Sequence, residues 1–217
     1  MYNEGIVFGT FHSYRDLNLI LNSGVKIGTP EAKIEEVEVL GSDGTIDYTE
    51  YFGEVFYKNR TLTFPFTIKA KVAEDIERVY ADVCKKIHSK KVKITLDWES
   101  GYYFKGRISV GELAHQKRIG TFTITCDCEP YRYKNDVTIS SCVVSGKASV
   151  VYINDQKNVT PQFKTSSSMT ISFENVTTTI KTDGTFTVPG IVFKEGENVV
   201  TYTGNGTVEV SYQERRL

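Results

Sequence analysis

The chain has 217 residues, of which 40% are hydrophobic and 24% are charged, and its formal net charge is −1. This composition is typical of a folded globular protein, long enough for one large or two small domains. A charge this close to zero gives no overall attraction to nucleic acid or to an anionic membrane. No apolar run approaches the roughly 20 residues that span a bilayer. We therefore expect no specific nucleic-acid partner and no membrane insertion.

The four cysteines are too few and too irregularly spaced for a disulfide framework, so we expect reduced thiols. Cys126 and Cys128 lie two residues apart, on one face of a predicted strand, where free cysteine behaves as a small hydrophobic residue. A zinc site would need two further ligands, and neither a C-x-x-C pair nor an H-x-x-x-H spacing supplies them. We expect no metal and no cofactor.

The chain begins with an apolar segment from Ile6 to Phe11, followed by the run Leu17–Leu21, whose pattern fits either a strand or a helix. Residues 34–40 then alternate apolar and acidic side chains, which predicts a strand with an acidic outward face. Ser42-Asp43-Gly44 predicts a turn, because Asp caps its own backbone and Gly accepts a positive φ without strain.

A second strand is predicted from Ile46 to Tyr57, with a bulge or loop near Gly53 where the alternation slips. After a turn, Thr61–Ile68 alternates cleanly, with every second residue apolar. Pro65 cannot donate to a ladder, so this strand should lie at an edge or have one free side. The aromatic residues of the segment could stack on sugars or bases, although packing inside the fold or between subunits is the more common use.

Residues 73–89 form the one convincing helix, because apolar residues recur at steps of three and four. The C-terminal end of this helix carries a basic run, which we interpret as a solvated helix cap rather than a nucleic-acid patch: Lys85, Lys86, Lys90, Lys91 and Lys93. Predicted strands cover residues 91–98, 102–110 and 121–128. Asp97 and Glu99 have the spacing of a glycosidase pair, but we interpret them as solvated residues of a hairpin rim.

Beyond Tyr133 the sequence becomes rich in Ser, Thr, Val and Gly, and short predicted strands alternate with turns at the spacing of a β-sandwich. Asp183-Gly184 predicts a hairpin, and Gly204-Asn205-Gly206 predicts another turn. We therefore expect two domains, residues 1–133 and 134–217. The fold class is mainly β with one helix: an α+β N-terminal domain and a β-sandwich C-terminal domain.

Several of these segments resemble one family. One pattern consists of Asp43-Gly44-x-x-Asp47, then Gly53, an aromatic pair, and Tyr57-x-Asn59-Arg60 before an F-x-F strand. This pattern is similar to the N-terminal domain of distal tail proteins of long-tailed, non-contractile bacteriophages and prophages. Three further segments are similar to the same family: Ser13–Leu17 near the start of the first domain, Glu129-Pro130-Tyr131 at its end, and residues 193–212 near the end of the second domain. The resemblance favours a strand for Leu17–Leu21.

The resemblance implies a non-enzymatic structural protein at the virion tail tip, or baseplate, made in the cytoplasm of the bacterial host. Such proteins form homohexameric rings that contact the major tail tube protein, the tail hub or tail-associated lysin, and the tape measure protein. A galectin-like or carbohydrate-binding-module-like C-terminal domain implies a receptor-binding protein or host glycan as a further partner. The alternative function is a stand-alone carbohydrate-binding module or host-glycan adhesin. Candidate residues for contacts between copies or with partners are Tyr48, Tyr51, Phe52, Phe56, Tyr57 and Arg60.

Overall fold

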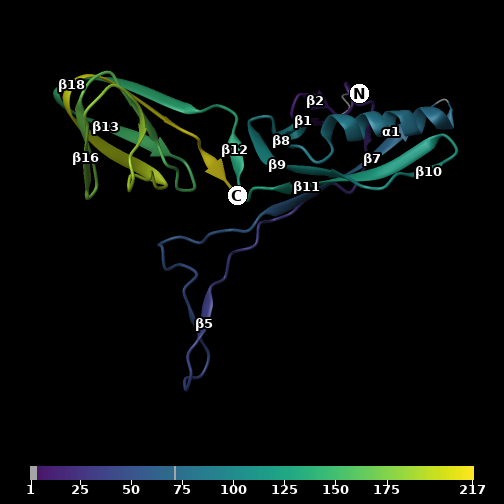
Figure 1. Cartoon of the computed structure of the whole chain (residues 1–217), viewed down its shortest axis with the longest axis horizontal. Helices are drawn as coiled ribbons and strands as arrows, with labels where there is room; N and C mark the ends of the chain where they lie inside the picture. Colours follow the sequence, from purple (N-terminus) through teal and green to yellow (C-terminus); the bar gives the residue numbers. More distant parts are fainter. Residues whose placement is uncertain (1–3, 71) are drawn as a thin grey trace. The chain divides into compact units, whose positions relative to one another are not determined.

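The computed structural model describes residues 4–70 and 72–217. Its contacts divide the chain into two compact units, Met1–Arg132 with Leu217, and Tyr133–Arg216. Both are built mainly from strands, and the first contains α1 (Ala73–Ile87), the single α-helix of the described residues (Figure 1). The predicted fold class, mainly β with one helix in the first part of the chain, is confirmed.

The sheet of the first unit has the strand order β2-β1-β8-β9-β11-β7-β3, while β10 pairs with β11 and β4 pairs with β7. A separate two-stranded sheet contains β5 (Glu36–Glu38) and β6 (Thr45–Asp47). The bounds of the other strands are β1 Ile6–Phe8, β2 Phe11–His12, β3 Ile20–Leu21, β4 Lys26–Ile27, β7 Arg60–Lys69, β8 Lys91–Leu96, β9 Tyr102–Val110, β10 Ala114–Gln116 and β11 Ile119–Cys128.

Strand β7 forms the centre of the first core. Its predicted buried face is confirmed, but the predicted edge position is wrong, because β7 has partner strands on both sides. Its four inward side chains are completely buried: Leu62, Phe64, Phe66 and Ile68. Along its whole length β7 pairs with β11, whose inward residues include Cys126 and Cys128, both at 0% exposure. On its other side β7 pairs with β4 at Leu62 and Thr63 and with β3 at Phe66 and Thr67. Pro65 falls in the gap between these short strands, so no ladder bond is lost there.

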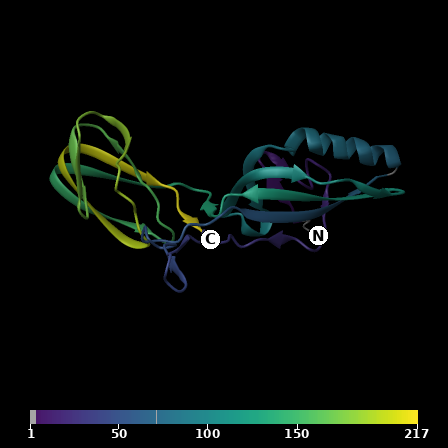
Figure 2. The ribbon, with the colours of Figure 1, turned by 60° about the horizontal axis from the view of Figure 1, so that its bottom comes forward.

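Helix α1 packs on this sheet through the predicted apolar stripe. Ile76 and Val83 are 0% exposed, and the helix contacts β7, β9 and β11 (Figure 2). Acidic Glu74 and Asp75 occupy its first turn and basic Lys85 and Lys86 its last, so both clusters favour the helix dipole. The helix prediction is confirmed.

Four expected strands of the first unit are shorter than predicted. Those expected at 34–40 and 91–98 are reduced to β5 and β8, and two others differ more. The strand expected from Ile46 to Tyr57 stops at Asp47, because the Asp47 carboxylate accepts the Thr49 N–H at 2.8 Å and turns the backbone. Of the run Leu17–Leu21, only Ile20 and Leu21 are in a strand. Leu17 is buried in a turn closed by hydrogen bonds to the carbonyl oxygen of His12. In both places a local polar contact replaces the ladder.

Strand β12 (Arg132–Lys134) carries the chain from the first unit into the second, and β19 (Arg215–Arg216) follows the last long strand. The six-stranded sheet of the second unit has the order β16-β15-β18-β14-β17, with β13 paired to β18. The bounds are β13 Thr138–Asn154, β14 Gln162–Thr165, β15 Met169–Phe173, β16 Val176–Ile180, β17 Gly184–Thr187 and β18 Gly196–Tyr212.

The long strand β18 organises this sheet. One of its edges pairs with β13 throughout, and the other pairs with β15 at Thr201–Gly204 and with β14 at Val208–Ser211. Side chains from both halves meet in one core, where the ring of Phe163 on β14 lies 6.5 Å from that of Tyr202. The sandwich is therefore formed by two halves of one curled sheet.

The turn predicted at Gly204-Asn205-Gly206 is wrong, because these residues lie inside the continuous strand β18. The glycines serve a close crossing instead. A Cβ at Gly206 would lie 2.5 Å from the hydroxyl oxygen of Ser167 and 2.7 Å from that of Ser166. The two glycines are needed because a neighbouring segment lies too close for a side chain, and not because the chain changes direction there.

The hairpin predicted at Asp183-Gly184 is also wrong. Strands β16 and β17, on either side of it, occupy opposite ends of the strand order. Strand β16 pairs instead with β15 across the tight turn at Glu174, whose φ is 47°. The Asp-Gly pair allows the backbone to bend, but it does not choose which strands hydrogen-bond.

Candidate functional site

The segment Glu31–Lys58, here called the arm, is a long hairpin of the first unit. Backbone hydrogen bonds of 2.8 Å close its base, from the Lys58 N–H to the Glu31 oxygen and from the Lys33 N–H to the Phe56 oxygen. Further out, β5 and β6 pair only with each other among the described strands (Figure 1). From Glu31 to Lys58 no residue is buried, so the arm contributes nothing to the core of its own unit.

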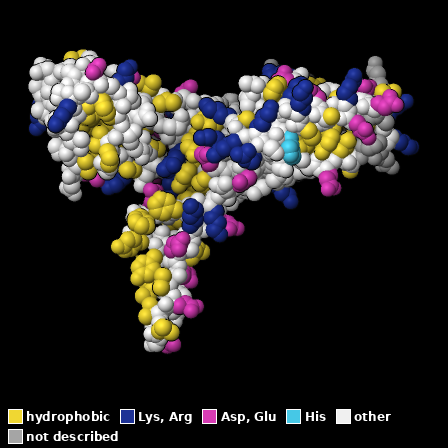
Figure 3. All heavy atoms as spheres, in the orientation of Figure 1, with side chains coloured by type: hydrophobic (Ala, Val, Ile, Leu, Met, Phe, Trp, Pro, Cys, Tyr) yellow, Lys and Arg dark blue, Asp and Glu magenta, His cyan; other side chains and the backbone are white. Residues whose placement is uncertain are grey.

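The arm nevertheless carries many large apolar side chains (Figure 3). Nine of them are exposed: Ile34, Val37, Val39, Leu40, Ile46, Tyr48, Tyr51, Phe52 and Phe56. A two-stranded ribbon in water is marginally stable, and a contiguous apolar surface on it indicates a site that another surface covers.

Four of the predicted residues form an aromatic row on the arm. The ring centroids are 6.0 Å apart for Tyr48 and Tyr51, 5.3 Å for Tyr51 and Phe52, and 6.3 Å for Phe52 and Phe56, all in edge-to-face contacts. Tyr51 and Phe52 are the most exposed of the four, at 73% and 79%. The row therefore has a defined shape while most of its area stays available for a partner.

The β5–β6 ribbon has an acidic face and an apolar face. Glu36 lies directly opposite Asp47, whereas Val37 lies opposite Ile46, so the two pairs point to opposite faces. Hydrogen bonds from Thr49, through its hydroxyl and its backbone N–H, hold the pKa of Asp47 below its ordinary value. The carboxylate is thus charged at neutral pH, although like charges opposite each other destabilise a ribbon.

The other two predicted residues, Tyr57 and Arg60, lie where the arm meets the sheet. Tyr57 is half-buried, and its ring lies 6.3 Å from that of Tyr131. Arg60 is only 4% exposed, with its guanidinium 5.5 Å from the centre of the Phe104 ring. Burial, reinforced by the nearby Arg132, lowers the pKa of Arg60. Arg60 therefore lies inside the unit and is separated from the exposed row.

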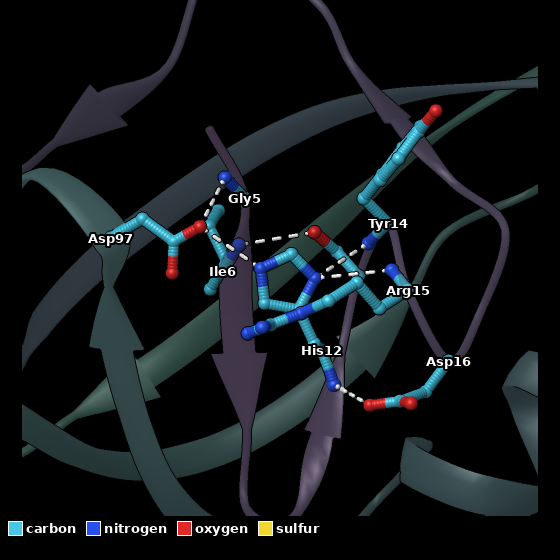
Figure 4. Close-up of polar contacts among 8 residues, drawn as sticks. Gly5, Ile6, His12, Tyr14, Arg15, Asp16 and Asp97 are labelled. Carbon is cyan, nitrogen blue, oxygen red and sulfur yellow. Dashed lines mark hydrogen bonds and ion pairs between the residues drawn. The ribbon is translucent and has the colours of Figure 1, made fainter. Parts of the chain in front are cut away.

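Asp97 and Glu99 lie in the connection of the β8–β9 hairpin, as the sequence predicted, but both carboxylates are hydrogen-bonded rather than only solvated. The Asp97 carboxylate accepts hydrogen bonds from the Gly5 N–H and from Nε2 of His12, both at 2.9 Å (Figure 4). Glu99 accepts two hydrogen bonds from Nη1 of Arg132, at 2.8 and 3.0 Å. The hairpin position follows from the sequence, whereas the spacing does not reveal that Gly5, His12 and Arg132 lie beside these carboxylates.

The His12–Asp97 pair has the composition of a catalytic dyad, but both ring nitrogens already have partners. Nδ1 of His12 accepts the N–H groups of Tyr14 and Arg15, each at 3.1 Å, so Nε2 carries the proton and donates it to Asp97 (Figure 4). His12 is 5% exposed. The pair therefore positions the N-terminal strand, since neither nitrogen is open to a substrate.

The thiols and the described acidic and histidine residues do not form a further site. All four cysteines are free, and burial raises the pKa of Cys128 to about 12, which leaves it unreactive. Among the described residues no three His, Cys, Asp or Glu side chains lie together as metal ligands. Within the same residues, no helix has the length and apolar character to cross a membrane.

The second unit offers little platform for a sugar. Six of its aromatic side chains are buried: Tyr152, Phe163, Phe173, Phe193, Tyr202 and Tyr212. A surface hollow of about 320 Å³ is lined by Ser141, residues 164–166 and residues 207–209, which are polar or aliphatic. This arrangement gives no support to the alternative of a stand-alone glycan binder.

No protein-family model and no curated protein sequence matches the chain. Among solved structures, its fold is similar to that of a phage tail-hub protein, which confirms at the level of fold the resemblance to distal tail proteins. The structure that shows this is the crystal structure of the SPP1 Dit (gp 19.1) protein, with a TM-score of 0.72 and 13% identity over 99% of each chain. That protein is described as a paradigm of the hub adsorption apparatus in phages that infect Gram-positive bacteria.

Sequence reasoning missed the aliphatic part of the arm. Ile34, Val37 and Val39 were assigned to the inward face of a strand, yet they are 65%, 51% and 43% exposed. Their alternation correctly indicates a surface that should be covered. It does not reveal that the described residues of its own unit leave this surface uncovered.

Proposed function

We propose that this chain is a structural component of a phage tail tip, a distal tail protein whose copies close into a hexameric ring. The ring would connect the tail tube to the hub or tail-associated lysin and to the receptor-binding apparatus, with the tape measure protein nearby. The likeness in fold to the SPP1 hub protein supports this function. The proposal includes no enzymatic activity.

The arm is the observation that carries the proposal. A ring needs a head-to-tail contact, in which one surface of a copy meets a different surface of the next. The arm has an apolar surface that its own unit does not cover, and large aromatic anchors such as Phe52 commonly dominate interfaces. We propose that Tyr48, Tyr51, Phe52 and Phe56 are interface anchors and that Tyr57 and Arg60 fix the root of the arm.

Native mass spectrometry and negative-stain microscopy test this function. The parent protein should form closed hexamers, and a Phe52→Ala, Phe56→Ala variant should give folded monomers. Tyr14→Ala is a matched control, because Tyr14 is 42% exposed, close to the 43% of Phe56, but lies outside the arm. A ring that closes only on the tail tube protein requires the same test with that partner present. Absence of six-fold rings in both conditions refutes the proposal.

We also propose that residues 1–133 and 134–217 are independent domains. Each has its own buried cluster, one around β7 and one around β18. Expressed separately, each fragment should unfold in one cooperative transition with increasing urea. If neither fragment unfolds cooperatively while the full chain does, the division is wrong.

A further inference from the structure

The β8–β9 hairpin carries two pairs of like charges in direct register. Lys91 lies opposite Arg107, and Lys93 lies opposite Lys105. All four side chains are exposed and, two residues apart on each strand, they share the outward face of the sheet. We call these four residues the basic ribbon. Like charges directly opposite each other destabilise an antiparallel pair, so these four side chains reduce the stability of the hairpin.

The neighbouring carboxylates offset only part of this charge. Glu129 lies 2.8 Å from the Lys91 ammonium and 3.7 Å from that of Lys105, and Asp127 on β11 is in register with Arg107. Lys93 lies 4.3 Å from the centre of the Tyr103 ring, a contact that leaves its charge in place. Four cations thus face two carboxylates.

The arm has the complementary charge. Between Glu31 and Lys58 the sequence carries eight acidic and two basic residues, a net charge of −6, whereas the whole chain carries −1; the remainder therefore carries +5. The acidic face of β5–β6 also places like charges close together, although only one pair is directly opposed and Glu38 lies opposite Thr45. Glu36 and Asp47 are directly opposite each other, and Glu38 follows two residues after Glu36.

We infer that the acidic face of the arm binds the basic ribbon of the neighbouring copy. This inference rests on the proposed ring and names the surface that receives the arm. The spacings match, because residues i and i+2 of any strand are separated by roughly 6.5–7 Å. When the two clusters meet, the opposite charges offset the repulsion among like charges within each cluster. Association must then weaken with salt.

Charge reversal in both surfaces tests the assignment. Glu36→Lys with Glu38→Lys in the arm, or Lys93→Glu with Lys105→Glu in the basic ribbon, should each weaken ring formation by about tenfold or more, since like charges then meet. The combination of all four substitutions should restore ring formation to within about threefold of the parent. Sedimentation velocity between about 50 and 500 mM NaCl measures the association. Salt should weaken the parent's association, whereas reversal of one surface should abolish or invert this dependence, because salt also screens repulsion.

Controls separate this inference from the proposed function. Lys164→Glu with Lys181→Glu, exposed residues of the second unit, should leave ring formation unchanged. Circular dichroism checks folding, and Lys93→Gln with Lys105→Gln repeats the test without reversed charge. If the aromatic double variant abolishes rings but ribbon reversal does not, the receiving surface is wrong while the ring stands. If the parent binds a short DNA duplex, and ribbon reversal removes that binding but not the rings, the ribbon is a nucleic-acid site and the inference is overturned.

Discussion

The aromatic residues of the arm and of the core should respond oppositely to truncation, and a matched pair of phenylalanines makes the comparison direct. Phe52 is 79% exposed on the arm, whereas Phe64 is 0% exposed on β7 with its ring 6.1 Å from that of Phe8. We expect Phe64→Ala to destabilise the first unit strongly. We expect Phe52→Ala to leave the stability of the isolated subunit almost unchanged.

The magnitudes follow from burial. Removing a buried phenylalanine costs about 3–5 kcal/mol, the sum of lost apolar transfer and the cavity left behind. For a domain of this size 1 kcal/mol shifts Tm by roughly 4 °C, so Phe64→Ala should lower Tm by roughly 10–20 °C. An exposed side chain without buried contacts changes the free energy of unfolding by less than about 0.5 kcal/mol. The two variants should therefore differ by at least about 2.5 kcal/mol.

Urea unfolding followed by tryptophan fluorescence measures this difference. The chain has a single tryptophan, Trp98, and it lies in the first unit, so its signal reports that unit alone. The protein must be dilute and in high salt, because association adds stability by mass action. A loss above about 1.5 kcal/mol for Phe52→Ala under these conditions would show that the arm packs within its own subunit. That result would refute the interface argument.

Three further outcomes test other contacts. Burial raises the pKa of Tyr152 to about 12 and also raises that of its hydrogen-bonded partner Tyr202. The second unit should therefore lose stability as pH rises from about 10 to 12. In urea titrations at pH 8 and 11, the Tyr152→Phe, Tyr202→Phe variant should show a smaller loss. Asp97→Ala should lower the stability of the first unit by about 1–3 kcal/mol, because it leaves two hydrogen-bond donors unpaired. Asp97→Asn keeps an acceptor oxygen and should lower it less. Equal losses of stability in thermal denaturation would contradict the role of Asp97 as acceptor. In the second unit, Val143→Lys should leave stability nearly unchanged because Val143 is 77% exposed. Val208→Ala, at a fully buried site, should destabilise the unit by about 1–3 kcal/mol. The reverse order of the urea midpoints would refute the assigned faces of β13 and β18.

Local periodicity determined much of this fold. The alternation in Thr61–Ile68 predicted β7 and its buried face, and the three-and-four spacing after residue 72 predicted α1. These patterns hold because a strand repeats every two residues and a helix every 3.6, so the buried face is written into neighbouring positions. The aromatic residues between Tyr48 and Phe56 also stand out in the sequence, and the structure places them in an exposed row; their role in packing between subunits stays a prediction.

Pairing and coverage were decided only by tertiary structure. The Asp183-Gly184 pair could not show that β16 and β17 lie at opposite ends of the strand order, because strand partners are chosen by contacts distant in sequence. The sequence likewise could not show that Arg60 lies inside the unit, since that depends on Phe104 and Arg132. The alternating residues of 34–40 indicated a face to be covered, and only the structure shows that their own unit leaves it open. A hydrophobic pattern specifies that burial is favourable, whereas the identity of the covering surface depends on three-dimensional packing.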